Sequence, residues 1–241
     1  MAQLFVGLSG FSYKPWQGEG RFYPAGLKQK EFFAYYAKRY NAVEMDGTWY
    51  RMPAESAVKS WLEGAPEGFR YTFKAHRSIT HIRRLKPESL ESVTFQLDRL
   101  KPLRDGGKLG AVFFQLPPNF KRNDERLQEF VEALPQGWNY AIEFRNESWH
   151  HEATDEILKS RGIAWASWDT GEAAGQRRDT GTTIYTRLRR SSYSDEQLES
   201  WAKWFREMLE SGKDVHVFFK HEDEGSPWID ADRLLERMKK L

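Results

Sequence analysis

Short apolar runs recur along this chain, and most of them are followed by a segment with helical periodicity. Runs of about four to eight apolar residues have the usual length of a buried strand. We therefore predict eight strands. They are LFVGL (4–8), AVEM (42–45), YTFKA (71–75), LGAVFFQL (109–116), YAIEF (140–144), IAWASW (163–168), TIYTRL (183–188) and VHVFF (215–219).

The segments between these runs place apolar residues three and four positions apart, as an amphipathic helix does. In the segment 28–39, Phe32, Tyr35 and Tyr36 fall on one stripe. The connection 170–182 is too rich in glycine and polar residues to predict a long helix. Further helices are predicted at 55–62, 88–103, 124–134, 152–160, 195–209 and 229–238.

Strands that alternate with helices are typical of βαβ units on a parallel sheet. Eight such units in 241 residues predict an α/β fold, a single (β/α)8 TIM barrel over residues 1–241 with eight parallel strands, an outer helix ring and an irregular sixth connection. An open doubly wound sheet is the alternative. A dinucleotide-binding version of it requires G-x-G-x-x-G after the first strand, where this chain has GLSGFSYKPW.

Composition narrows the functional classes. The chain has no Cys, which excludes disulfides, thiolate metal sites and cysteine nucleophiles. A formal net charge of +2 does not indicate a nucleic-acid or membrane partner. No apolar run has the length of a membrane span, and the start MAQLFVGLSG lacks the basic region of a signal peptide. We expect a cytoplasmic protein without membrane contact, and the sequence predicts no oligomeric state.

Polar residues follow nearly every predicted strand. Active sites of TIM barrels lie at the carboxyl ends of the strands, so these residues are the candidates for a site. The strand ends carry Ser9, Glu44, Asp46, Lys74, His76, Gln115, Glu143, Arg145, Asp169, Arg187, Lys220 and His221. Side chains alternate along a strand, so Glu143 and Arg145 point the same way.

Carboxylates beside cations can separate acid and base roles, and Arg and Lys can bind phosphate or carboxylate groups. We predict Glu44, Glu143, Lys74 and Asp169 as catalytic residues. The substrate-binding candidates are Ser9, Tyr13, Trp16, Gln115, Arg145, Arg187 and Lys220. A purely structural ion-pair network is the alternative for the charges. The aromatic residues in the loops after the first two strands either line a pocket or pack as a lid. They are Phe11, Tyr13, Trp16, Phe22, Tyr23, Trp49 and Tyr50.

Metal and cofactor chemistry receive little support from the sequence. The six His are scattered, no H-E-x-x-H occurs, and neither a Walker loop nor a G-x-S-x-G elbow is present. We therefore predict no cofactor and no metal residues. The oxygen and nitrogen donors that can converge on a divalent metal are Glu44, Glu143, Asp169 and His221. The cations expected beside them, which would repel a metal, are Lys74, Arg145, Arg187 and Lys220.

An ordered set of motifs runs along nearly the whole chain. It comprises GLSGFSYKPW, FYP, VEMDGTWYRMP, FKAHRSITH, FFQLPP, EFRNESW, IYTRLRRSSY and WAKWF. In this set the chain resembles the YecE-like family (domain of unknown function 72), bacterial and archaeal proteins with a TIM-barrel fold. The resemblance implies the barrel and names no reaction. It supports as site candidates Glu44, Lys74, Gln115, Glu143, Arg145, Trp149 and Arg187.

The chain departs from the usual family pattern in places. Glu44-Met45-Asp46 stands where the family usually has E-I-N. Asn146 stands where the family commonly has a His. Arg189-Arg190 and Lys220-His221 add positive charge after strands seven and eight, a corner where many barrels bind phosphate. These changes are consistent with an anionic ligand or with a member whose activity has changed.

The leading functional hypothesis is an enzyme, a hydrolase or a lyase/isomerase. It would act on an anionic or sugar/nucleotide-like small molecule by carboxylate acid–base chemistry at the barrel mouth. The alternative is a non-catalytic nucleotide or single-stranded nucleic-acid binding module, which aromatic loops and basic residues can form together. The basic residues behind that alternative are Arg83, Arg84, Arg187, Arg189 and Arg190.

Overall fold

Eight strands alternate with helices in the computed structural model, which describes residues 1–169, 176–220 and 226–240. Strands are hydrogen-bonded in chain order, and β8 pairs in parallel with β1, so the sheet closes into a barrel. The predicted (β/α)8 fold is confirmed, and each strand ends within one residue of its prediction. The strands are β1 (Leu4–Ser9), β2 (Ala42–Met45), β3 (Arg70–Lys74), β4 (Leu109–Gln115), β5 (Tyr140–Glu143), β6 (Ala164–Asp169), β7 (Thr183–Leu188) and β8 (Asp214–Phe219).

The helices match the predicted segments, and one is much shorter than expected. The segment 28–39 begins with a 3-10 turn at Gln29–Glu31 and holds only a short α1 (Phe32–Tyr36), because its aromatic residues are weak helix formers. α7 begins at Pro227, two residues early, since proline fits the first turn of a helix. The helices after α1 are α2 (Glu55–Gly64), α3 (Leu90–Asp105), α4 (Asp124–Ala133), α5 (Glu152–Ser160), α6 (Asp195–Glu210) and α7 (Pro227–Lys240).

The sixth connection was predicted to be irregular. Its residues 170–175 lie outside the described ranges, and residues 176–182 contain no helix. In the ranges that are described, no helix combines the length and apolar character needed to cross a membrane.

The chain packs as two compact units. Met1–Glu44, Ser167–Arg177 and Thr186–Leu241 form the first unit, and Met45–Ala166 with Arg178–Tyr185 form the second. The assignment of the whole chain to one domain stays a prediction.

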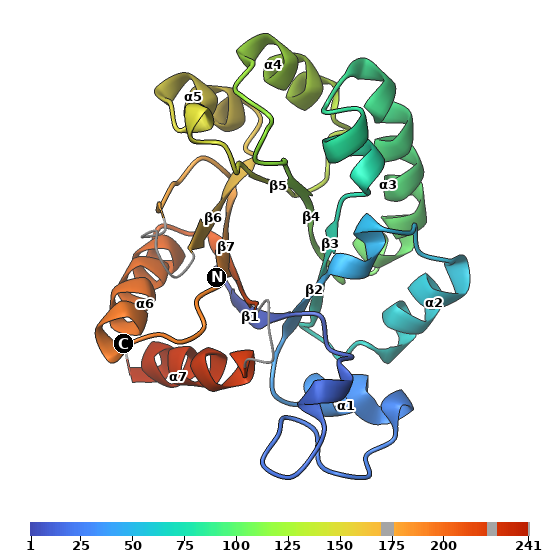
Figure 1. The fold of residues 1–241 in the computed structure, drawn as a ribbon, viewed down its shortest axis with the longest axis vertical. Helices are drawn as coiled ribbons and strands as arrows, with labels where there is room; N and C mark the ends of the chain where they lie inside the picture. The colour runs from blue at the N-terminus through green and yellow to red at the C-terminus, as the bar shows by residue number, and fades with distance from the viewer. Residues whose placement is uncertain (170–175, 221–225, 241) are drawn as a thin grey trace. The chain divides into compact units, whose positions relative to one another are not determined.

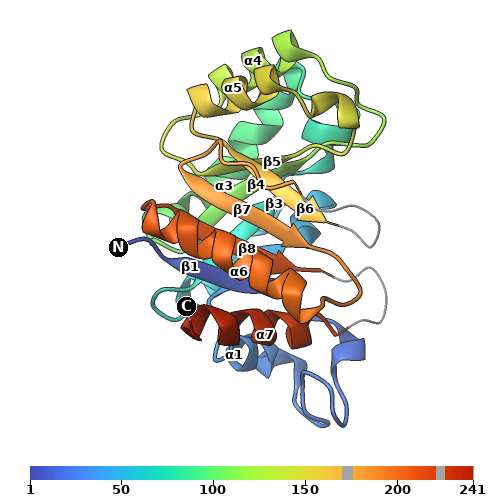
Figure 2. The ribbon, with the colours of Figure 1, turned by 90° about the vertical axis from the view of Figure 1, so that its left-hand side faces the viewer.

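In the first unit, β1 and β2 approach closely. A Cβ at Gly7 would lie 1.9 Å from the carbonyl oxygen of Ala42, so only glycine fits there. The Tyr36 hydroxyl accepts a hydrogen bond from the Leu8 amide and donates one to the Ala42 carbonyl, both at 2.7 Å. Figure 2 shows α6 and α7 side by side along β8 and β1. These contacts fix the carboxyl half of β1 against the first residue of β2.

In the second unit, helices α2 and α3 lie on the outer side of β3 and β4 (Figure 1). The rings of Tyr71 and Phe73 lie 6.1 and 5.4 Å from the Trp61 ring of α2, so these two strand residues face the helices. On β4, Phe114 contacts Phe130 of α4 in the same way. Because side chains alternate, the residues between them face inward.

Candidate functional site

The carboxyl ends of β3, β4 and β5 bring four predicted site residues of the second unit together. Lys74, Gln115 and Glu143 end these three strands, and each has the inward direction that alternation assigns. Arg145 follows two residues after Glu143, on the same side. Register pairs Gln115 with Glu143 directly, so their side chains are neighbours.

Hydrogen bonds join these four side chains into one row. Lys74 Nζ donates to Gln115 Oε1 at 2.9 Å, and Gln115 Nε2 donates to Glu143 Oε1 at 2.8 Å. Arg145 Nε donates to the same Glu143 oxygen. Lys74 and Glu143 are buried, whereas the Arg145 side chain is 20% exposed. We name this set the Lys74–Arg145 row.

Aromatic and polar groups surround Lys74. Its Nζ lies 5.4 Å from the centre of the Trp49 ring, a cation–π contact. The Thr48 hydroxyl and the Gln96 amide both bond the Lys74 carbonyl, at 2.6 and 3.2 Å. These bonds fix the strand end that carries the lysine. Among the described residues, the buried Nε1 of Trp49 has no hydrogen-bond partner, so packing alone orients this ring.

His81 also contacts the Trp49 ring. Its ring is 5.1 Å from the Trp49 ring, and its Nδ1 lies 2.9 Å from the Thr80 hydroxyl. Burial lowers the pKa of His81 below its usual value of 6.5, and the charges of Lys74 and Arg84 lower it further. The imidazole is therefore neutral at pH 7, a form that can accept or donate a hydrogen bond.

In the first unit, Ser9, Glu44 and Arg187 form a second group. Glu44 Oε1 accepts from the Ser9 hydroxyl at 2.7 Å and from Arg187 Nη2 and Nε at 2.8 and 3.1 Å. The Glu44 and Arg187 side chains are both fully buried. A buried pair of this kind needs its mutual bonds to offset the loss of water. The catalytic role of Glu44 stays a prediction.

Asp169 has a different set of partners, also in the first unit. Its carboxylate accepts from Arg190 Nε at 3.0 Å, from the Arg189 amide at 3.1 Å and from the Tyr193 hydroxyl at 2.5 Å. Burial raises the pKa of Asp169, and bonds from Tyr193 and Arg190 oppose that shift. Burial likewise raises the pKa of the Tyr193 hydroxyl.

A cavity of 530 Å³ borders this carboxylate. Arg177 lies over the Trp201 ring at 4.5 Å and donates to the Ser200 hydroxyl at 2.7 Å. Two arginines and two carboxylates line the cavity, so their formal charges cancel. It is lined by Asp169, Arg177, Arg190, Glu196, Gln197, Ser200 and Trp201.

Three predicted substrate-binding residues have other surroundings. Trp16 is buried and packs on Phe22 and Trp228, at ring distances of 6.0 and 5.7 Å. Tyr13 is exposed and lies 4.9 Å from Trp16. Lys220 is half-buried, and its amide donates to the Leu188 carbonyl at 2.9 Å. The binding roles of these residues stay predictions.

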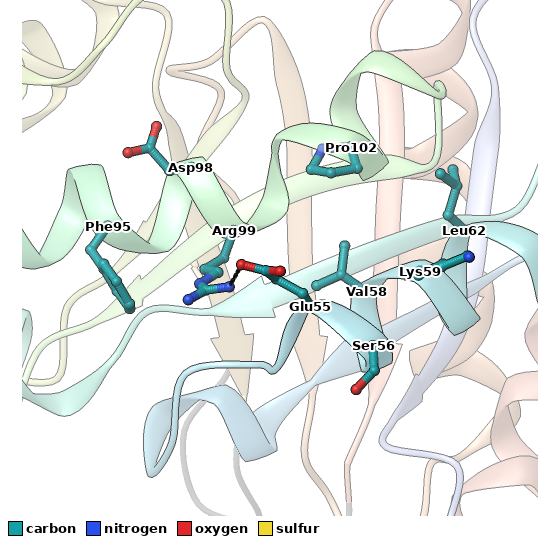
Figure 3. A pocket seen from close by; sticks show the side chains of 9 residues that line it. All are labelled: Glu55, Ser56, Val58, Lys59, Leu62, Phe95, Asp98, Arg99 and Pro102. Atoms are coloured by element: carbon teal, nitrogen blue, oxygen red, sulfur yellow. Dashed lines mark hydrogen bonds and ion pairs between the residues drawn. The ribbon is translucent and has the colours of Figure 1, made fainter.

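A larger cavity of 710 Å³ lies between α2 and α3 on the second unit (Figure 3). The Glu55 and Arg99 side chains point toward each other there and form an ion pair. Apolar side chains of Val58, Leu62 and Phe95 make up much of its wall. None of the predicted site residues lines it.

Sequence reasoning missed His81 and left open whether Trp49 lines a pocket or packs as a lid. Both lie in stretches with a visible signal, the aromatic cluster Thr48-Trp49-Tyr50 and the motif FKAHRSITH. Only packing shows that both rings converge on Lys74. Within the described ranges, no group of three or more His, Asp or Glu is placed to hold a metal ion. His221, a predicted donor, lies outside those ranges.

Comparisons with known proteins agree with the motifs. The family described as "Protein of unknown function DUF72" matches residues 5–241. The UPF0759 protein YunF of Bacillus subtilis is 24% identical over 97% of this chain and 94% of its own length. The UPF0759 protein YecE of Escherichia coli K12 is 29% identical over 66% of this chain and 55% of its own length.

Two solved structures share the fold. The DUF72 family protein TM1631 of Thermotoga maritima is 28% identical, with a TM-score of 0.84 over 98% of this chain and 99% of its own. The DUF72 family protein EF0366 of Enterococcus faecalis is 19% identical, with a TM-score of 0.77 over 99% of this chain and 98% of its own. The second match is evidence for the fold alone.

Proposed function

The chain belongs to the DUF72 family, and we propose that it is an enzyme that acts on an anionic small molecule at the Lys74–Arg145 row. The substrate is sugar- or nucleotide-like, and the reaction is an acid–base step in which Glu143 exchanges a proton with the substrate. Lys74 and Arg145 bind the anionic group.

The observation that carries this proposal is the continuous row of bonds from Lys74 through Gln115 and Glu143 to Arg145. A carboxylate held by two donors keeps one orientation, which a general base requires. Two cations flank it, and cations favour the binding of phosphate or carboxylate groups. The row ends at a partly exposed arginine, so it meets solvent on one side.

The surroundings of Lys74 support the same proposal. Trp49 and His81 contribute an aromatic face and a neutral imidazole beside the ammonium group. Pockets for small molecules commonly combine apolar rings with a few placed polar groups. His81 is a further proton acceptor or donor within this arrangement.

A binding screen tests the proposal. The purified chain is titrated with sugar phosphates, nucleotides and small carboxylic acids, with thermal shift as the first readout and calorimetry as the second. Glu143→Gln and Lys74→Met are expected to lower the affinity of any ligand found by about tenfold or more, since hydrogen bonds to charged groups contribute about 1.5–3 kcal/mol. Turnover of that ligand is then followed by NMR.

Matched controls come from the outer helices. Glu55→Gln and Lys59→Met alter an acid and a base whose side chains are exposed on α2, and neither should change affinity. If the wild-type chain binds none of these anions, the proposal fails. A single-stranded oligonucleotide belongs in the same screen. Binding that falls steeply with salt would favour the nucleic-acid module instead.

The structure offers little for that alternative. Arg187 is fully buried in its pair with Glu44. Arg83 bonds the Ser92 hydroxyl, and Arg84 bonds the Asn119 amide oxygen at 3.1 Å. Arg190 is paired with Asp169. These arginines therefore already serve internal contacts.

A further inference from the structure

Two large apolar side chains are exposed beside the residues that surround Lys74. Tyr50 and Ile82 are each 67% exposed. Tyr50 follows Trp49, and their rings lie 4.6 Å apart at a nearly perpendicular angle of 87°. Ile82 follows His81, whose ring also contacts Trp49. Single exposed apolar residues are common, but Tyr50 and Ile82 each follow directly in the chain one of the two residues whose rings meet beside Lys74.

The segment that carries Ile82 has an uncommon backbone. Ser78–Ile82 forms one turn of π-helix, a rare element that is frequent at functional sites. Arg84 and Leu85 follow with φ angles of 48° and 59°, in the left-handed region that bulky residues avoid. Leu85 is buried, and its amide donates to the Ile79 carbonyl at 3.0 Å. The fold thus keeps a strained turn that buries Leu85 and exposes Ile82.

The two charges that act on His81 are both positive. They belong to Lys74 and Arg84, and the imidazole itself is neutral. The Trp49 ring lies next to the Lys74 ammonium group, and the rings of Tyr50 and His81 both contact the Trp49 ring. A ligand that matches this surface carries an anionic group and a flat ring.

We propose that Trp49, Tyr50, His81 and Ile82 form a ring-binding surface for the substrate whose anionic group lies at Lys74. The substrate class is a small phosphate or carboxylate that bears a planar, unsaturated ring. The inference rests on the proposed function, and it adds the ring to the anion. Flat rings stack on aromatic side chains, whereas saturated rings of equal size lack that π surface.

Three simple ligands distinguish the contribution of the ring to affinity from that of the anionic group. Phenyl phosphate, cyclohexyl phosphate and inorganic phosphate are titrated into the full chain by calorimetry and by NMR line broadening. Such small ligands bind with dissociation constants on the order of millimolar. Phenyl phosphate is expected to bind about tenfold more tightly than either of the other two, the effect of one stacked ring.

Substitutions on the exposed surface locate that ring. Tyr50→Ala and Ile82→Ala should weaken phenyl phosphate severalfold and leave inorganic phosphate unchanged. Tyr50→Phe keeps the ring and should keep the affinity. Phe95→Ala and Ile229→Ala are matched controls, because these apolar side chains are also exposed, at 48% and 53%, and lie elsewhere. All of these changes are at exposed positions, where they are tolerated by the fold.

Each outcome has a distinct meaning. If cyclohexyl phosphate binds as tightly as phenyl phosphate, or if Tyr50→Ala changes nothing, the ring-binding surface is wrong while the anion site at Lys74 stands. If none of the phosphates or carboxylates binds, the proposed function fails as well. A protein partner that binds the chain, with loss on Tyr50→Ala and with no ring preference among the phosphates, would also overturn the inference.

Discussion

Two glutamate–arginine ion pairs near strand ends differ in how deeply they are buried and in which side chains they contact further. In the first unit, Glu44 and Arg187 are both fully buried, and Ser9 adds a further bond to the same oxygen. In the second unit, Glu143 is equally buried, but Arg145 is partly exposed and the row continues to Gln115 and Lys74. We expect the fully buried pair to contribute mainly to stability, and the row that meets solvent and ends beside aromatic rings to bind a ligand.

The largest expected effect comes from breaking the fully buried pair. Arg187→Met should lower the free energy of unfolding by about 3–5 kcal/mol, because Glu44 then stays buried without its cation. Arg145→Met should cost only about 1–2 kcal/mol, since Gln115 still donates to Glu143 and water can approach. Urea denaturation followed by circular dichroism measures both.

Lys59→Met, at an exposed ion pair of α2, is the control and should not change stability measurably. If Arg187→Met does not fold, the double variant with Glu44→Gln removes both charges and should recover part of the loss. Equal losses at Arg187 and Arg145 would contradict the distinction between the two pairs.

A middle-sized effect is expected at the centre of the row. Gln115→Met keeps the length of the side chain and removes the bonds to both Lys74 and Glu143. Stability should fall by about 1–2 kcal/mol, and the ligands found in the screen should bind less tightly because Lys74 is no longer fixed. Gln128→Met on α4 removes an exposed bond to Glu132 and serves as control. Unchanged ligand affinity in Gln115→Met would mean that the row is structural.

The smallest expected effect is a pH dependence at His81. Its pKa is below 6.5 in the folded chain, chiefly through burial and further through Lys74 and Arg84. The unfolded chain therefore binds more protons near pH 6, and stability falls as pH drops from 6.5 toward the folded pKa. His81→Gln should flatten this part of the stability curve.

An NMR titration of the histidine ring protons checks the cause. Lys74→Met should raise the pKa of His81, because one of the two neighbouring charges is gone. The pKa of His150 is lowered by burial and by Arg178, so the same variant should leave it unchanged. An unaltered His81 titration in Lys74→Met would mean that the lysine charge does not act on the imidazole. The proposal that both residues belong to one site would then lose support.

Much of the site in the second unit follows from local sequence. Alternation along a strand places Glu143 and Arg145 on one side, and apolar runs with polar ends mark where strands β3, β4 and β5 stop. The sequence cannot tell which of the charged side chains at strand ends are fully buried. Burial of Arg187 depends on side chains far away in the chain, and so does the edge-to-face contact of Trp16 with Trp228, 212 residues later. Asp169 likewise meets Tyr193 only after packing.

The sequence by itself determined the strands, most of the helices, the barrel and the family, because these depend on periodic patterns and ordered motifs within the chain. Tertiary structure alone decided which pairs are fully buried, which aromatic rings surround Lys74 and where a strained turn exposes Ile82. Periodicity assigns a side chain to a face. Burial and contact are set by the groups that fold against that face, and those groups come from distant parts of the chain.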